Sequence, residues 1–301
     1  MVRPATFRAN EQTISNNYFQ KLDNTKLYVN QLAQKEFDGL TSVLEKVGVT
    51  VLVYQDTLKP ETPDALFPNN WVSFHDCGTL VLYPMYAKNR RWERREEIIK
   101  FVEKKGFKVN EIIDYTSKED QGIFLEGTGS MILDRINKKA YCTLSERSDE
   151  HLFVDFCEDM GYLPIVFNAK QTVAGKRLPI YHTNVMMSVA TDFAIICLQS
   201  IDNARERNIL INQLEENGKE IIEITEKQMY NFAGNVLELN GRNGGVLVMS
   251  TTAYESLSED QKKRINKYVS IIYSPIPNIE TNGGGGVRCM IAELFLPSQF
   301  R

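Results

Sequence analysis

Short apolar runs recur along the whole chain, and most of them come in closely spaced pairs. Their residues alternate in polarity or are rich in Val, Ile and Leu, as is typical of β-strands. Only a few residues separate the two runs of a pair, which predicts hairpins. We expect three such pairs, at 129–135 with 139–145, 182–190 with 192–200, and 234–240 with 244–250.

Longer stretches with helical periodicity and single apolar runs fill the intervals between these pairs. Helices are expected at 91–105, 149–160, 203–216 and 258–268. A single strand is expected after each helix, at 107–113, 162–169, 219–225 and 270–276, and further strands at 49–54 and 79–84. The order strand, strand, helix, strand therefore repeats at intervals of roughly 50 to 60 residues.

This repeat predicts an α/β fold built from stacked or radially arranged modules. Each module would bury one face of its sheet only against its neighbours. A doubly wound sheet is the competing interpretation, and it is weaker because the strands come as hairpin pairs instead of alternating singly with helices. No linker or low-complexity segment divides the chain, so we expect one catalytic domain over residues 1–301.

Composition and charge exclude some classes of binding partner. The chain is 43% hydrophobic and 25% charged, as in ordinary globular proteins, and its net charge is −4 with no long basic run. Nucleic acid is therefore not an expected partner. No apolar stretch approaches the ~18 residues of a membrane span, and the N-terminus lacks the apolar core of a signal peptide. We expect a cytoplasmic protein without a membrane partner, and we leave a homo-oligomer open.

The five cysteines have no paired spacing, so a disulfide framework is not expected. Four of them lie in apolar or mixed segments and are interpreted as small buried hydrophobes: Cys77, Cys142, Cys157 and Cys197. No His/Cys cluster has the spacing of metal ligands, and no metal or cofactor is expected.

The fifth cysteine, Cys289, follows the run "GGGG" at 283–286 and leads into the apolar segment "MIAELFLP". Glycine is the residue that costs most to order, so four in a row suggest either a flexible surface loop or a backbone that comes close to something else. The apolar segment, read as a buried strand or the start of a helix, favours the second interpretation. A thiol held between a glycine loop and a rigid element is a candidate nucleophile.

A cysteine nucleophile needs a base or a positive field, because the thiolate is the attacking species. Among three histidines, His75 lies at an expected strand end and His151 at an exposed helix start, which leaves His182 as the plausible partner. The alternative interpretation of His182 is a buried histidine without a catalytic role. Glu126 stands between an apolar strand and Gly-Thr-Gly, where a carboxylate either points into a cavity or remains a solvated turn acid.

Taken in order, the segments "FPNN", "LEGTGS", "HTN" and "GGGGVRC" closely resemble the guanidino-group-modifying superfamily. This superfamily includes arginine deiminases, dimethylarginine hydrolases, amidinotransferases and succinylarginine dihydrolases. The resemblance extends from about Phe67 to Pro297. It implies a five-bladed α/β propeller, the pentein fold, with the site at its centre.

The resemblance also assigns roles to individual residues. It implies that Cys289 is the nucleophile, His182 the general acid and base, and Glu126 the residue that orients the histidine or binds substrate. Arg90 and Arg147 fall where the dimethylarginine hydrolase branch binds the substrate carboxylate, a task that suits arginine; solvated arginines at helix ends are the alternative. The other residues expected to contact substrate are Asn69, Asn70, Asn184 and Gly286.

Two positions depart from the superfamily pattern, because Asn70 and Asn184 stand where many guanidinium-binding members carry Asp. A buried cation without these anions would lose several kcal/mol of compensation. An Asn keeps one acceptor and one donor, which match a neutral ureido group. We therefore expect a ureido substrate, with citrulline first, and the resemblance is nearest to a citrulline-utilising hydrolase branch.

The expected reaction converts citrulline to ornithine, ammonia and carbon dioxide through a covalent cysteine intermediate. The order in which ammonia and ornithine leave is open. Rival interpretations are an arginine deiminase or dihydrolase, an amidinotransferase and, from another class, a non-catalytic binder of amino acids. The dihydrolase branch also has an Asn near the first position and accepts a guanidino substrate, so arginine ranks second and is not excluded.

Overall fold

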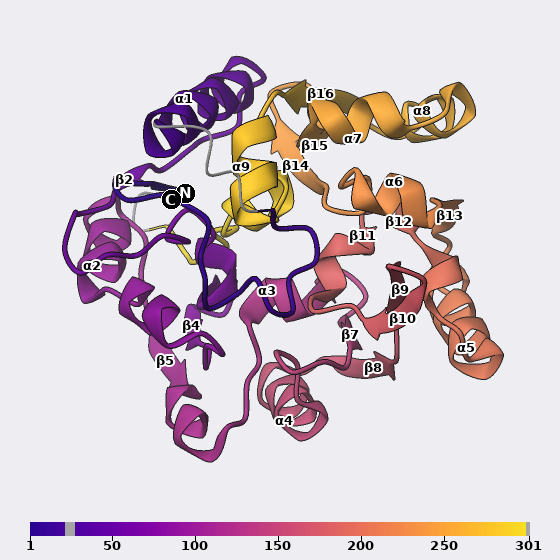
Figure 1. Cartoon of the computed structure of the whole chain (residues 1–301), viewed down its shortest axis with the longest axis horizontal. Helices are drawn as coiled ribbons and strands as arrows, with labels where there is room; N and C mark the ends of the chain where they lie inside the picture. Colours follow the sequence, from indigo (N-terminus) through magenta and orange to yellow (C-terminus); the bar gives the residue numbers. More distant parts are fainter. Residues whose placement is uncertain (22–27, 299–301) are drawn as a thin grey trace.

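The computed structural model describes residues 1–21 and 28–298, and its framework is a set of four similar three-stranded sheets. In each sheet the first two strands are antiparallel and the third pairs in parallel with the second, after a connection that contains a helix. Figure 1 shows the four units arranged around a common centre with these helices on the outside. This is the module that the hydrophobic pattern predicts.

The four units follow one another along the chain. Their elements are β3 (Val72–Phe74), β4 (Thr79–Leu82), α2 (Glu96–Lys104) and β5 (Glu111–Asp114); β6 (Met131–Asp134), β7 (Lys139–Thr143), α4 (Glu150–Met160) and β8 (Leu163–Phe167); β11 (Met187–Val189), β12 (Phe193–Ile196), α5 (Ala204–Glu215) and β13 (Glu220–Glu223); and β14 (Leu237–Gly241), β15 (Gly244–Ser250), α7 (Thr251–Ser256), α8 (Glu259–Ile265) and β16 (Ser270–Ser274).

The remaining elements connect or complete these units. They are β1 (Val2–Arg3) paired in parallel with β2 (Tyr54–Gln55), the β9–β10 hairpin (Lys170–Val173 and Lys176–Pro179), and the helices α1 (Val29–Lys46), α3 (Gly127–Ser130), α6 (Glu226–Tyr230) and α9 (Pro277–Gly283). Short α3 and α9 lie near the centre (Figure 1).

The local sequence explains where these helices begin. Asp149 and Asn203 accept hydrogen bonds from the first-turn N–H groups of α4 and α5, and Ser258 forms a capping box with Gln261 in α8. The buried face of α1 is formed by apolar residues at helical spacing: Ala33, Phe37, Leu40 and Leu44.

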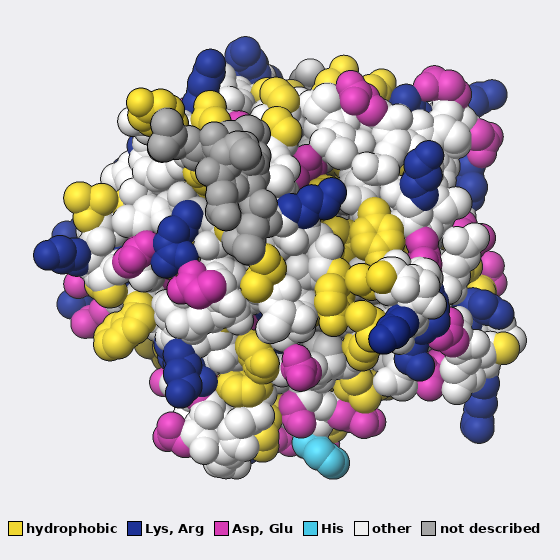
Figure 2. Space-filling model, viewed as in Figure 1, with side chains coloured by type: hydrophobic (Ala, Val, Ile, Leu, Met, Phe, Trp, Pro, Cys, Tyr) yellow, Lys and Arg dark blue, Asp and Glu magenta, His cyan; other side chains and the backbone are white. Residues whose placement is uncertain are grey.

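The second strand of each sheet carries the core. Every residue of β7 and β12 is buried, because these strands lie between two neighbours and are covered by helices or adjoining sheets. All three predicted hairpins are confirmed; in the first, Met131 lies opposite Cys142. On the face drawn in Figure 2, acidic and basic side chains are interspersed.

Several expectations are wrong. The apolar run 49–54 is a strand only from Tyr54, because its partner β1 is two residues long. The segment after Cys289 forms neither a regular strand nor a helix: Cys289 lies in a 3₁₀ turn, Val287–Met290, and residues 291–297 are irregular. Cys77 is exposed, whereas the other four cysteines are buried.

In the described ranges, no helix is long and apolar enough to cross a membrane.

Candidate active site

The residues just before the first strand of each unit meet at the centre of the molecule. Asn70 precedes β3, Glu126 and α3 precede β6, and Asn184 precedes β11. Cys289 comes from the 3₁₀ turn after α9. A common site thus forms from segments that are far apart in the sequence.

A small cavity of about 20 Å³ lies in this region, which is room for about one water molecule. Cys289 and His182 border it. The N-terminal segment contributes Thr13 and Asn17, and this segment passes across the centre of the molecule (Figure 1). The rest of the wall comes from Asp64, Phe67, Asn70, Arg90, Arg147, Tyr181 and Gly283 to Gly285.

His182 is held by a carboxylate. Its Nε2 lies 2.8 Å from Oε2 of Glu126, and both side chains are buried. Burial lowers the pKa of His182 to about 4, although the hydrogen bond to Glu126 opposes this shift. Burial alone would raise the pKa of Glu126, but Arg147, His182 and Arg90 outweigh it and hold that pKa far below the ordinary range. At neutral pH the pair is therefore a carboxylate beside a neutral imidazole.

The two predicted carboxylate-binding arginines both border the cavity, and both already have protein partners. Arg90 forms a two-pronged ion pair with Glu93, at 2.9 and 3.0 Å, and donates from Nη1 to Oδ1 of Asn70 at 2.9 Å. Arg147 lies 3.5 Å from Glu126 and donates to Thr13 O at 3.2 Å. The alternative of solvated helix-end arginines is wrong, because both side chains are buried.

Cys289 is surrounded by amides. Its Sγ lies 3.2 Å from Nδ2 of Asn235 and 3.4 Å from Nδ2 of Asn184. Burial raises the pKa of the thiol, and the two amides together with Arg288 oppose that rise. At neutral pH Cys289 is consequently a thiol, so it would have to be ionised in order to act as a nucleophile.

Two polar atoms at the cavity have no hydrogen-bond partner in the described structure, namely Nδ2 of Asn70 and Oδ1 of Asp64. Asp64 is buried, and burial raises the pKa of its carboxyl group while Arg90 lowers it. Buried groups of this kind are expected to be satisfied in a protein's working state. These atoms are thus available to a ligand as one donor and one acceptor.

Glu126 and Asn184 lie behind the wall of the cavity, next to His182 and Cys289. The structure brings Asn69 and Gly286 near the same centre, but neither borders the cavity. Gly286 instead packs against Asn235: a Cβ at this position would lie 2.8 Å from Oδ1 of that side chain.

The glycine run serves close packing more than flexibility. Gly284 has φ +63°, and a Cβ there would lie 2.6 Å from Asn17 of the N-terminal segment. Asn17 donates to the carbonyl oxygens of Gly283 and Gly284 at 3.3 and 3.4 Å. The run therefore lets the N-terminal segment rest on the backbone beside Cys289.

Asp64 and Asn235 were not among the residues expected from the sequence. Asp64 is a single acid in a loop, and nothing local marks it. Asn235 could have been found by aligning the repeats, because it precedes β14 by two residues just as Asn70 precedes β3.

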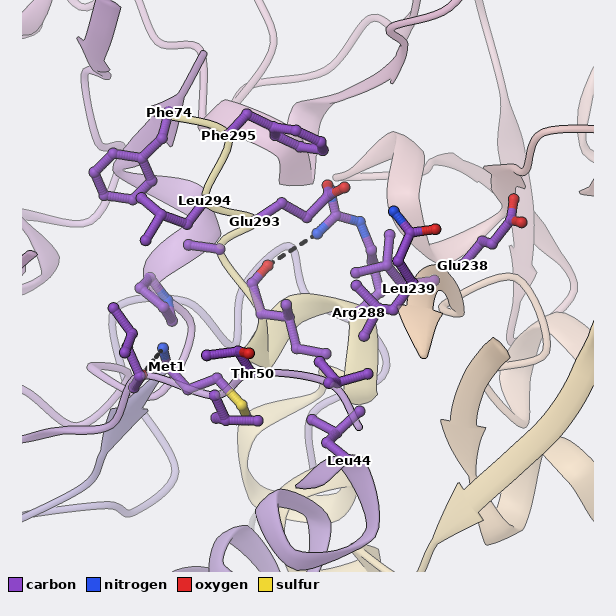
Figure 3. A pocket seen from close by; sticks show the side chains of 18 of the residues that line it. Met1, Leu44, Thr50, Phe74, Glu238, Leu239, Arg288, Glu293, Leu294 and Phe295 are labelled. Atoms are coloured by element: carbon purple, nitrogen blue, oxygen red, sulfur yellow. Dashed lines mark hydrogen bonds and ion pairs between the residues drawn. The ribbon is translucent and has the colours of Figure 1, made fainter. Parts of the chain in front are cut away.

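A second cavity, of about 720 Å³, has no lining residue in common with the first, but adjacent residues of the chain line the two. Cys289 borders the small cavity and its neighbour Arg288 borders the large one. Figure 3 shows Arg288 reaching toward Glu293, with 3.2 Å between Nη2 and Oε2. Much of the remaining lining comes from the first strands of the sheets and from residues 291–295. Within the described ranges, no cluster of three acid, His or Cys side chains is placed to hold a metal ion.

Acidification should destabilise the fold between pH 6.5 and about 4 through His182. An unfolded histidine binds its proton near pH 6.5, whereas the folded one stays neutral until about pH 4. Stability is therefore lost as the pH falls through this window, by an amount on the order of 3 kcal/mol. In urea unfolding from pH 7.5 to 4.5, His182→Gln should show a shallower decline than the unchanged protein. The decline does not vanish in this variant, because His75 is also buried with a lowered pKa and still contributes to the loss of stability on acidification.

The control is the same substitution at His151, which is exposed in the first turn of α4. His151→Gln should leave the pH dependence of unfolding unchanged. Equal slopes of the free energy of unfolding against pH, for His182→Gln and the unchanged protein, would contradict the buried, neutral state of His182.

Comparison with known proteins gives one family and several solved structures. The family model described as N,N dimethylarginine dimethylhydrolase, eukaryotic, matches residues 3–296. A search of the curated protein sequences found no match.

The structural relatives have low sequence identity. The substrate-bound N-terminal domain of ArgZ, an arginine dihydrolase from the ornithine-ammonia cycle in cyanobacteria, is similar with a TM-score of 0.72 and 15% identity over 98% of both chains. The apo ArgZ chain matches 99% of this chain with a TM-score of 0.73 and 15% identity, but this chain spans only 40% of it. A dimethylarginine dimethylaminohydrolase with bound S-methyl-L-thiocitrulline has a TM-score of 0.61 and 15% identity over 96% of both chains.

Proposed function

Since the chain belongs to the N,N dimethylarginine dimethylhydrolase family, and so to the guanidino-group-modifying superfamily that its motifs resemble, we propose that it is a hydrolase of ureido or guanidino amino acids with citrulline as its preferred substrate. Reaction would occur at Cys289. The proposed products are ornithine, ammonia and carbon dioxide.

The observation that carries the choice of citrulline is the amide environment of the nucleophile. Sγ of Cys289 is contacted by Asn184 and Asn235, and the unpaired Nδ2 of Asn70 lies at the same cavity. An amide donor can bind the ureido oxygen, which a carboxylate would repel. A neutral head group also needs no buried counter-charge.

The reaction would proceed in two steps. The Cys289 sulfur bonds to the ureido carbon, and the C–N bond to one nitrogen breaks as that nitrogen takes a proton through His182. Water, deprotonated by His182, then attacks the remaining thiocarbamate and releases the thiol. The resulting carbamate decomposes to carbon dioxide and an amine, so that one water is consumed for each citrulline. Glu126 keeps His182 oriented throughout.

The amino-acid end of the substrate would bind to the charged side chains of the cavity. Arg90 and Arg147 are the proposed partners of the α-carboxylate, and the free oxygen of Asp64 suits the α-ammonium group. The cavity of about 20 Å³ is too small for an amino acid of this size, so part of its wall must move on binding. Thr13 and Asn17 belong to the segment that lies across it.

Arginine is the second candidate, as substrate of a deiminase or dihydrolase, and the charges around the cavity favour it. Three buried carboxyl groups, of Asp64, Glu93 and Glu126, surround the two guanidinium groups of Arg90 and Arg147. Burial raises the pKa of Asp64, and that of Glu93 to about 7, and a cationic head group would favour the ionised form of these groups. ArgZ, named as an arginine dihydrolase, has a similar fold.

Incubation of the pure protein with citrulline and, separately, with arginine distinguishes the two substrates. Ornithine and ammonia from citrulline at a higher kcat/KM than from arginine would support the proposal. Citrulline that accumulates from arginine would instead identify a deiminase, and ornithine from arginine at the higher kcat/KM a dihydrolase. Products that form only when an acceptor amine is added would identify an amidinotransferase, and binding without turnover a non-catalytic binder.

Gly129→Ala should reduce turnover about 100-fold while the protein stays folded. A Cβ at Gly129 would lie 2.3 Å from Nδ2 of Asn70 and 2.8 Å from the ring of His182, so both groups must shift. The control is Gly39→Ala in α1, where the nearest atom, Oγ of Ser274, is 3.8 Å away; it should keep full activity and gain up to about 1 kcal/mol of stability. Unchanged steady-state kinetics in Gly129→Ala would contradict this placement of His182.

Three broader statements belong to the same proposal. The four units, together with β1, β2, α1 and residues 287–296, would form a five-bladed propeller. The whole chain would act as a single catalytic domain. The cysteine content and composition support a cytoplasmic location.

A further inference from the structure

Asn235 is a buried asparagine at the nucleophile to which the function proposed above assigns no step. It lies between α6 and β14, in a turn where its N–H donates to Phe232 O at 2.9 Å. It is the fourth unit's counterpart of Asn70, because each lies two residues before the first strand of its sheet. Its side chain, unlike that of Asn70, has all its polar contacts within the protein.

The backbone fixes the orientation of the Asn235 amide. Oδ1 accepts from the N–H of Cys289 at 3.4 Å, and Nδ2 donates to the carbonyl oxygen of Asn184 at 2.8 Å. A flipped amide would place two acceptors against each other at Asn184 and two donors against each other at Cys289. The N–H directed at Sγ of Cys289, at 3.2 Å, therefore follows from its neighbours.

The two amides at the sulfur differ in the hydrogen bonds that they can form with it. Asn184 presents both Nδ2, at 3.4 Å, and Oδ1, at 3.7 Å, so it can accept a hydrogen bond from the S–H group of the thiol or donate one to the thiolate. Asn235 presents only a donor. Its hydrogen bond is thus strongest when the sulfur is charged, because bonds to an ionised acceptor are about twice as strong as neutral ones.

No cation of the small cavity is in hydrogen-bond contact with the sulfur in the described residues. His182 is bonded to Glu126 and is neutral at neutral pH, and Arg90 and Arg147 are directed at carboxylates. The fixed N–H groups are then the direct source of stabilisation for a thiolate, with Arg288 acting from behind the turn.

We propose that Asn235 stabilises the Cys289 thiolate by N–H donation, and so sets the reactivity of the nucleophile, in addition to holding the turn 286–289. This role rests on the proposed function of Cys289. Gly286 is needed for this orientation of Asn235, because any Cβ at position 286 would displace Oδ1 of Asn235.

The test follows the alkylation of Cys289 by iodoacetamide as a function of pH, without substrate. All variants carry Cys77→Ser, which removes the exposed thiol, and the Cys289 peptide is quantified by mass spectrometry. The midpoint of the pH profile reports the thiol pKa, whereas the opening of the cavity affects only the overall rate. Asn235→Ser removes the donor, and Asn235→Asp replaces it with a charge that repels a thiolate.

We expect the midpoint to rise by about one unit in Asn235→Ser and by more in Asn235→Asp. Asn240→Asp, the same change on exposed Asn240 at the end of β14, should leave the midpoint unchanged. Midpoints within about 0.3 units of the unchanged protein in folded Asn235 variants would overturn the proposal. Asn235 would then serve only to hold the turn 286–289. Should Asn235→Asp fail to fold, Asn235→Ser, which is neutral and smaller, decides the matter.

Steady-state kinetics separate this inference from the proposed function. With a substrate in hand, Asn235→Ser should lower kcat about 100-fold and change KM less than threefold, since the lost interaction forms with the charged sulfur. The alkylation profile requires no turnover, so a shifted midpoint supports the role of Asn235 even if citrulline and arginine both prove inert. Turnover that survives Cys289→Ser would sink the proposed function instead.

Discussion

Cys289→Ser should reduce turnover of citrulline by at least about 10⁴-fold, because the reaction proposed here passes through a bond to this sulfur. A serine hydroxyl is a far weaker nucleophile, and His182, held by Glu126, is not hydrogen-bonded to this side chain. Ligand binding should remain within a factor of about three, since the side chain is nearly isosteric and the two arginines are untouched. Steady-state assays for turnover and calorimetry for binding measure the two effects.

The matched control is Cys77→Ser, which makes the same atomic change at an exposed cysteine outside the site. It should leave kcat and KM unchanged. Retention of more than about a hundredth of the activity in Cys289→Ser would contradict the assignment of the Cys289 sulfur as the nucleophile.

Glu126→Gln should lower kcat by about 10³- to 10⁴-fold and also destabilise the fold. The carboxylate orients His182 at 2.8 Å and lies 3.5 Å from Arg147 and 4.0 Å from Arg90. A neutral amide keeps an oxygen acceptor for the imidazole, but it lacks the charge that stabilises a protonated His182 and leaves two buried guanidinium groups with less compensation. Loss of one partner of a buried ion pair typically costs about 3 to 5 kcal/mol, which urea unfolding would detect.

Glu119→Gln provides the control for this destabilisation. Glu119 is also a nearly buried carboxylate, paired with Arg94 at 2.6 Å and Arg91 at 3.2 Å, but it does not border the cavity. Its substitution should cost stability and leave kcat unchanged. A loss of kcat of similar size in both variants would mean that the effect at Glu126 reflects general weakening of the fold.

Much of the fold could be predicted from the sequence, because the relevant signals are local. Alternating apolar residues and short connections define the hairpins, such as β6 with β7, and the helix and parallel strand that follow each pair complete the unit. The prediction failed where an apolar run packs without a strand partner. Residues 49–53 pack mainly through Val49 and Val51, which contact the cluster around α1.

Helix α1 was missed although its signal was present. Phe37, Leu40 and Leu44 follow helical spacing, but the segment is polar on average and has no capping residue at Tyr28. Cys77 was assigned to the core from its apolar neighbours, yet it lies in the turn between β3 and β4, which faces solvent.

The candidate site could be predicted only in part. The proposed nucleophile, histidine and acid stand in motifs that can be read from the sequence, and the structure brings Cys289, His182 and Glu126 to one centre. Asp64 and Asn235 could not be found in the same way, because their proximity to the cavity depends on how the units are arranged around the centre. The glycine run, interpreted from the sequence as a backbone that comes close to something else, packs against Phe67, Asn17 and Asn235.

The central claim is tested most directly by rapid acid quenching of the enzyme during turnover of citrulline labelled with ¹³C at the ureido carbon. The account predicts that the peptide with Cys289 carries the label, with the mass of citrulline minus ammonia or minus ornithine according to which leaves first, and that Cys289→Ser carries none. Ornithine formation without any labelled Cys289 peptide, or labelling only from arginine with a ¹³C-labelled guanidino carbon, would contradict it.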